Sequence, residues 1–126
     1  MLPGPTQAGF SQERGLSPRD SVKFVTSSTL ITTLAMDETM RAVIATMTSG
    51  KVLAVTLPKV SLAAGMMYTI YYNDIAGGVT DNLTINDLGD DTDFSTITLN
   101  ANKERAVLVS DGVRWLTIHA GAPNTG

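Results

Sequence analysis

The sequence predicts an all-β protein: a single compact β-sandwich or barrel-like domain, of the jelly-roll or β-tulip kind, with an extended N-terminal arm. Roughly eight to nine short runs rich in β-branched residues follow one another with turn residues between them, as in sandwiches and barrels. The helix formers Glu, Gln, Lys and Arg are scarce, whereas Thr, Val, Ile and Gly are plentiful. A length of 126 residues fits one domain with its own core.

Each expected strand is a short run bounded by turn residues. Apolar and polar residues alternate along several runs, and successive side chains of a strand point to opposite faces. Leu53, Val55 and Leu57 share one face of their run, as do Leu83 and Ile85 in another. A turn, or one turn of helix, is expected at residues 37–40. In chain order, the runs span residues 22–26, 29–34, 41–47, 52–57, 66–73, 79–86, 94–99, 104–109 and 113–119.

The last two runs form the strongest local signal. They flank Asp111 and Gly112, a pair that can supply the positive φ angles of a tight hairpin turn. Trp115, the single tryptophan of the chain, follows just past the turn. Because an indole ring buries a large apolar area, Trp115 is the predicted anchor of this closing hairpin.

Composition divides the chain into an arm (residues 1–20), a β domain (21–120) and a short tail (121–126). The arm is dense in proline and glycine, which excludes a regular helix or a central strand there. One interpretation is a disordered tail. The interpretation we favour is an arm that orders on a neighbouring subunit or shell. Its predicted contact residues are the apolar Leu2, Phe10 and Leu16.

Several runs are apolar on both faces. Val107 and Val109 alternate with Ala106 and Leu108 in the first strand of the closing hairpin. A single core covers only one face of a sheet, so a second sheet or another subunit must cover the other. We therefore expect a homo-oligomer, since large exposed apolar patches are uncommon on monomers.

Charge and composition exclude several classes of protein. A net charge of −3 argues against direct binding to nucleic acid. The absence of cysteine excludes disulfides and thiolate metal sites. No run reaches the roughly 20 apolar residues of a membrane span, and no signal peptide is evident. We expect no membrane partner.

An acid-rich loop is the best candidate for a metal site. Asp87, Asp90, Asp91 and Asp93 could offer carboxylates to calcium. Their spacing does not match an EF-hand, however, and a solvated loop is the favoured interpretation. We expect no cofactor.

Two further groups of residues have side chains that could take part in catalysis or ligand binding. Ser110, Asp111 and His119 lie on one hairpin, with the serine and aspartate at its turn, so they do not suit a catalytic triad. We therefore expect that the protein is not an enzyme. Tyr68, Tyr71 and Tyr72 could stack sugars or bases, but packing in a core or subunit interface is favoured.

Four stretches carry a family resemblance. Residues 55–58 (Val-Thr-Leu-Pro) and 64–70 resemble the Thr-Leu-Pro strand end and the Gly-x-x-Tyr-x-Ile strand of small phage virion proteins. Residues 82–86 resemble their next strand. Residues 107–115 resemble their closing hairpin, with Ser-Asp-Gly at the turn and tryptophan three residues beyond it. The resemblance covers residues 41–119, and the acid-rich loop departs from it.

This resemblance implies a β-rich module that works as a homotrimer on a virion. The chain resembles short, single-domain capsid decoration (cement) proteins with extended N-termini. These proteins bind the major capsid protein on the outer surface of an icosahedral head. They hold capsid subunits together against the pressure of packaged DNA. The alternative is a tail fibre or spike module that binds a host receptor or glycan through the three tyrosines. A third hypothesis is an enzyme or metal-dependent module that uses the acid-rich loop.

Overall fold

The computed structural model describes residues 21–48, 50–74 and 81–121, and they confirm the all-β prediction. These residues form strands and loops, and none of their segments is a helix long and apolar enough to cross a membrane. The predicted arm with Leu2, Phe10 and Leu16, and residues 122–126, lie outside the described residues. The strands are β1 (Val22–Thr26), β2 (Thr33–Ala35), β3 (Ala42–Met47), β4 (Val52–Thr56), β5 (Met67–Asp74), β6 (Asn82–Asn86), β7 (Ile97–Leu99), β8 (Arg105–Ser110) and β9 (Trp115–Gly121).

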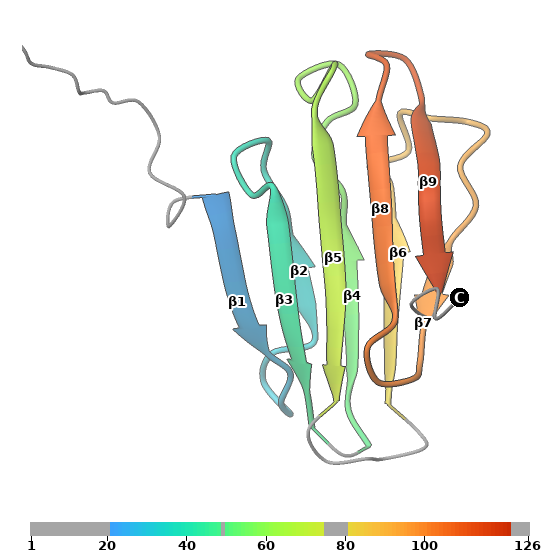
Figure 1. Cartoon of the computed structure of the whole chain (residues 1–126). Helices are drawn as coiled ribbons and strands as arrows, with labels where there is room; N and C mark the ends of the chain where they lie inside the picture. The colour runs from blue at the N-terminus through green and yellow to red at the C-terminus, as the bar shows by residue number, and fades with distance from the viewer. Residues whose placement is uncertain (1–20, 49, 75–80, 122–126) are drawn as a thin grey trace, which may run out of the picture.

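The strands form two sheets packed face to face, as expected for a sandwich (Figure 1). Sheet A has five strands in the order β1-β3-β5-β8-β9, and sheet B has four in the order β2-β4-β6-β7. Two strands are shorter than the sequence predicts. β2 begins only at Thr33 and β7 only at Ile97, because the preceding residues form loops.

The chain coils between the two sheets. It passes from β1 to β2, from β3 to β4 and from β5 to β6, changing sheet each time, so that neighbouring strands are parallel. In Figure 1 the coil descends in sheet A, returns upward in sheet B and advances to the right, which is the right-handed sense preferred for such crossovers. The first coil runs from Val22 to its partner Ala42, and the second runs from Ala42 to its partner Thr69. The second coil therefore contains more residues than the first. Unequal coils explain why the sequence shows no fixed-period repeat.

Antiparallel strands close one end of this coil. β7 pairs with β6 in sheet B, while β8 and β9 form a hairpin that extends sheet A beyond β5. Parallel pairing in the first six strands distinguishes this connectivity from that of a jelly roll, whose neighbouring strands are antiparallel. The opposite end, formed by β1 and β2, has no such strands among the described residues.

The core lies between the sheets and is built from one face of each strand. Leu53, Val55, Leu83 and Ile85 are buried as predicted from their alternation. Residues of sheet A complete the core from the other side. The largest fully buried side chains that sheet A contributes to the core are those of Tyr68, Tyr72, Met47, Ile70, Leu108 and Val43.

The closing hairpin differs in detail from the expected two-residue turn. Four residues connect Ser110 to Trp115, and of these only Gly112 has a positive φ, +95°. Asp111 instead stabilises the loop through its side chain, which accepts backbone hydrogen bonds from Val113 and Arg114, both at 2.8 Å. Hydrogen bonds to its carboxylate thus stabilise a loop that is longer than the expected two-residue turn.

Candidate interaction surface

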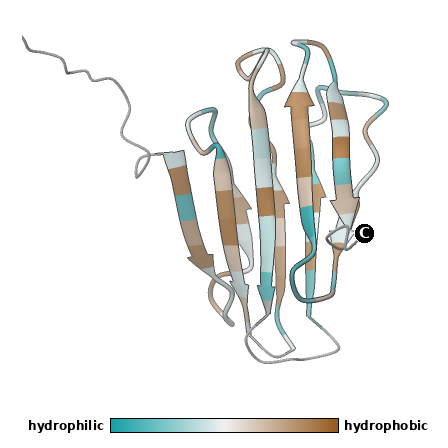
Figure 2. Ribbon diagram, in the orientation of Figure 1, coloured by the Kyte–Doolittle hydropathy of each residue, from teal (hydrophilic) through white to brown (hydrophobic). Residues whose placement is uncertain are grey.

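Sheet A has an apolar outer face. Residues opposite one another on paired strands lie on the same face of a sheet, so the register identifies the members. Bulky apolar residues face outward on all five strands, and Figure 2 shows the hydrophobic residues of both faces as brown segments along the strands. The outer face of sheet A is defined here by Val22, Phe24, Thr26, Ala42, Ile44, Thr46, Met67, Thr69, Tyr71, Asn73, Arg105, Val107, Val109, Leu116, His119 and Gly121, and the unpaired Ile118 adjoins it on β9.

Several of these side chains are open to solvent. Phe24 is 72% exposed, Ile118 61% and Met67 50%. Ile118 is the extra residue of a β-bulge between β8 and β9, where the register shifts after Val107. Such an irregularity interrupts the regular alternation of side chains along the strand.

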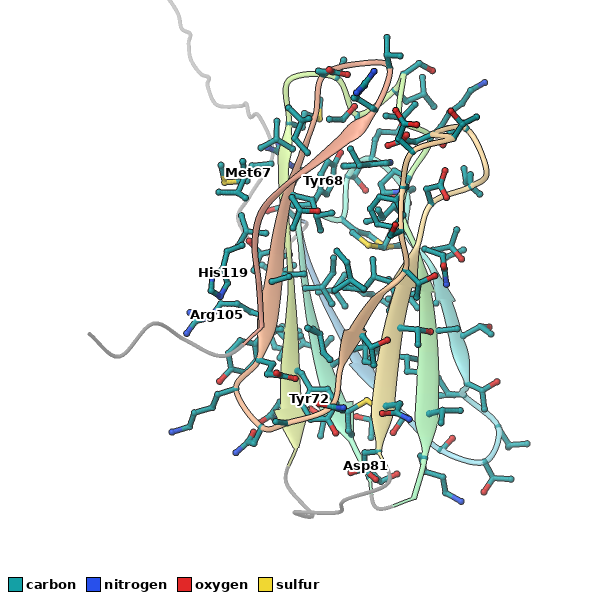
Figure 3. The ribbon with its side chains drawn as sticks, turned by 90° about the vertical axis from the view of Figure 1, so that its right-hand side faces the viewer. Met67, Tyr68, Tyr72, Asp81, Arg105 and His119 are labelled. Carbon is teal, nitrogen blue, oxygen red and sulfur yellow. The ribbon has the colours of Figure 1, made fainter. Side chains whose placement is uncertain are left out.

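Charged groups are few on this face, although Thr26, Thr46, Thr69, Asn73 and the Tyr71 hydroxyl are polar. Arg105 carries its one fixed charge, and His119 contributes the single imidazole of the chain. Figure 3 shows Met67, Arg105 and His119 projecting away from the interior, whereas Tyr68 and Tyr72 point between the sheets. A face with exposed apolar side chains and few charges is suited to packing against another protein.

The outer face of sheet B has a different character. Its side chains are small and mostly uncharged, and Val52 is the one large apolar residue among them that is well exposed. Its members in the register are Thr33, Ala35, Val52, Ala54, Thr56, Asn82, Thr84, Asn86 and Thr98. The two faces of the sandwich therefore differ, and sheet A is the better candidate for a binding surface.

The four aspartates of the acid-rich loop bind backbone N–H groups and a surface arginine. Asp91 is buried, and its Oδ2 accepts a hydrogen bond from the backbone N–H of Trp115 at 2.7 Å. Asp87 accepts one from the backbone of Asp91, and Asp90 one from the backbone of Val60. Asp93 lies 3.5 Å from Arg114 on the surface.

These contacts direct the four carboxylates to separate partners. Among the described residues, no group of three or more acidic, histidine or cysteine side chains is placed to hold a metal ion. The loop instead fastens residues 87–93 to the turn after β4 and to the closing hairpin. Sequence spacing could not reveal this role, because Val60 and Trp115 are distant along the chain.

The triad residues are not brought together. Ser110 is buried, and its hydroxyl donates a hydrogen bond to the backbone carbonyl of Val60 at 2.6 Å. Asp111 is exposed on the loop, where backbone hydrogen bonds from Arg114 and Val113 hold the pKa of its carboxyl below the ordinary value of 3.8. His119 lies on the outer face of sheet A, opposite Val107, whereas Ser110 faces the core.

The three tyrosines do not share a surface either. Tyr68 and Tyr72 are fully buried, while Tyr71 faces outward on sheet A. The Tyr68 hydroxyl donates to the backbone carbonyl of Glu38 at 2.8 Å, and burial raises its pKa above 10.0 although nearby Arg41 lowers it. The packing interpretation therefore holds for Tyr68 and Tyr72, and of the three tyrosines Tyr71 alone faces outward.

Trp115 occupies the core at the closing hairpin. Its ring packs edge-on against that of Tyr68, with centroids 5.6 Å apart at an interplanar angle of 76°. This is a favoured arrangement for two aromatic rings. Asp111, Gly112 and Trp115 thus lie in one compact structural unit rather than in a site open to a ligand.

Comparison with known proteins found no match among family models, curated proteins or solved structures.

Proposed function

We propose that this protein is a capsid decoration protein, which binds the outer surface of an icosahedral phage head as a homotrimer and stabilises contacts between major capsid subunits. The observation that carries the binding role is the exposed apolar outer face of sheet A, with Phe24, Met67 and Ile118. The resemblance of the closing hairpin and of residues 55–70 to small phage virion proteins supports the location on a head.

The mechanism is association through buried apolar area. Five strands spaced about 4.8 Å apart form a face roughly 20 Å on a side, about half the ~800 Å² that each partner contributes to a standard interface. The outer face of sheet A therefore needs additional contacts for stable binding. The N-terminal arm, with Leu2, Phe10 and Leu16, is the segment proposed to provide them, at the entropic cost of ordering.

The binding face is tested by charge insertion. Met67→Arg places a charge on the outer face of sheet A at an exposed position (50%), so the fold should persist. Val52→Arg is the matched control, because Val52 is similarly exposed (50%) but lies on the outer face of sheet B. Heads lacking the protein are incubated with each variant, and bound protein is measured after sedimentation.

We expect Met67→Arg to lose most head binding and Val52→Arg to retain it. Equal binding by both variants would exclude the outer face of sheet A as the contact surface. Deletion of residues 1–20 should leave a folded domain that no longer binds heads, and retained binding would remove the arm from the mechanism. Binding of the isolated protein to host cells instead of heads would favour the tail fibre or spike alternative.

A further inference from the structure

We propose that the free edge of β1 is the site at which the N-terminal segment of a neighbouring copy, residues 1–20, adds as a further strand of sheet A. This deepens the proposed function, because it names a second copy as the arm's partner and relies on the trimer proposed above. Four observations carry it: the uncapped first coil, the backbone groups of β1, the position of Lys23 and the residue pattern of the arm.

The two ends of the sandwich differ in whether further strands cover them. β7, β8 and β9 cover one end of the sandwich, whereas no described strand pairs with the outer edge of β1. Apolar residues are exposed at this end, with Phe24 at 72% and Leu30, in the loop before β2, at 93%. Repeating structures normally require a polar cap at such an end, and bare edges are sites of strand addition.

Backbone direction shows which groups are free. Ser27 donates its N–H to Thr46 of β3, and the carbonyl of Ser21 accepts from Arg41, both at 2.9 Å. Backbone groups alternate sides along a strand, so the even-numbered residues direct theirs to the open edge. Val22, Phe24 and Thr26 therefore present a row of donors and acceptors for an added strand, the arrangement used in β-augmentation.

Lys23 restricts what can pair there. It stands opposite the buried Val43, so it points to the core side of the sheet although it lies at the edge. An inward-pointing lysine on an edge strand blocks indiscriminate pairing. A strand laid against β1 must place a carboxylate next to this ammonium group. Two β1 edges pairing with each other would instead bury two lysines.

The arm has a suitable pattern. Between Pro5 and Pro18 it contains one acidic residue, Glu13. If Glu13 faces inward beside Lys23, the period of a strand places Phe10 and Leu16 on the opposite side. They would then extend the outer face of sheet A next to Phe24, so that one register satisfies both the charge and the apolar residues.

Residues 1–20 can pair with β1 of a neighbouring copy more readily than with β1 of their own chain. To pair Glu13 with Lys23 of the same chain, the tightest workable connection is a loop of Ser17, Pro18 and Arg19. The usual loop of this length needs helical φ and ψ at Ser17, which the following proline disfavours, and a positive φ at Arg19.

Other hairpin lengths are no better. A two- or four-residue loop would place Gln12 or Arg14, neither of them acidic, opposite Lys23, and a five-residue loop would remove Leu16 from the strand. A neighbour's edge imposes no such limit. Eight residues separate Glu13 from β1, which at about 3.3 Å each span roughly 26 Å. A head-to-tail contact of this kind closes into a ring when each arm reaches the next copy, as a trimer requires.

The test uses introduced thiols, since the chain has no cysteine. Glu13→Cys and Lys23→Cys proteins are purified separately, mixed, allowed to re-equilibrate after mild denaturation and oxidised without heads. We expect a disulfide-linked dimer in the mixture at several-fold the yield of either protein alone. The matched control is Glu13→Cys with Lys59→Cys, another exposed lysine, which lies in the turn after β4.

A mixture yield no higher than that of the control would overturn the proposal. So would a double variant, Glu13→Cys with Lys23→Cys, that forms only an intrachain link, because this would show the arm on its own edge. Independent support is expected from charge reversal: Glu13→Lys and Lys23→Glu should each lower the mass of the assembly in light scattering, and the double variant Glu13→Lys with Lys23→Glu, in which every arm again meets an edge of opposite charge, should restore it. These measurements need no capsid, so they can fail while head binding stands, and the reverse is also true.

Discussion

The carboxylate of Asp91 accepts a hydrogen bond at 2.7 Å from the backbone N–H of Trp115, the first residue of the last strand. Both residues are buried. The same carboxylate accepts a second bond, at 2.9 Å, from the backbone of Asp93. An acidic loop thereby fixes the start of β9 and the position of the ring that packs on Tyr68.

Asp91→Ala should destabilise the fold by about 2–3 kcal/mol, because it leaves the buried N–H of Trp115 without an acceptor. Urea unfolding followed by the fluorescence of Trp115 measures the change. Asp93→Ala is the control, since its exposed ion pair with Arg114 is worth less than about 1 kcal/mol. Equal losses for the two variants would contradict the assigned role of Asp91.

Calcium should leave the melting temperature unchanged. Asp87, Asp90 and Asp91 already accept backbone hydrogen bonds from different segments, and binding a shared cation would require those bonds to break. The comparison is thermal unfolding in millimolar calcium against a chelator. A calcium-dependent rise would revive the metal-dependent hypothesis.

Gly112→Ala should destabilise the closing hairpin. The residue has a φ of +95°, and a new Cβ would lie 3.3 Å from the Cβ of Ala64. Gly89→Ala is a matched control with a φ of +84° and nothing within 4 Å of the new Cβ. We expect about 1–2 kcal/mol from the backbone at either site, with an added loss at Gly112 from the contact. If Gly89→Ala lowers the free energy of unfolding more than Gly112→Ala does, the contact with Ala64 does not contribute to the loss.

Stability should fall in acid partly through Asp111. Backbone hydrogen bonds lower the pKa of its carboxyl in the folded state below 3.8, so its contribution is complete above that pH. The contribution is lost as pH falls through the lower folded value. Asp111→Asn removes the ionisation, so the difference in melting temperature between wild type and variant should be present at pH 6 and shrink towards pH 3. A difference independent of pH would show that the charge is not involved.

Sequence reasoning predicted the features that depend on local alternation. The buried faces of Leu53, Val55, Leu83 and Ile85 follow from period two alone, and the two layers follow from the number of short runs. It did not predict that β1, β3 and β5 are parallel neighbours, because pairing depends on contacts between distant residues and the coils differ in length.

The candidate surface was only partly predictable. An uncovered apolar face was expected from Val107 and Val109, but its extent needed the register that aligns Phe24, Ile44, Tyr71 and Arg105 across four strands. The bulge at Ile118 left no signal in the alternation. The partners of Asp90 and Asp91 were hidden for the same reason, since they are backbone groups far along the chain.

Antibody labelling of intact source particles in the electron microscope tests the central claim most directly. Serum raised against this chain should label the head in many copies spread over its surface. Label confined to the tail tip would contradict decoration and support receptor binding, and particles without label would contradict a place on the virion altogether.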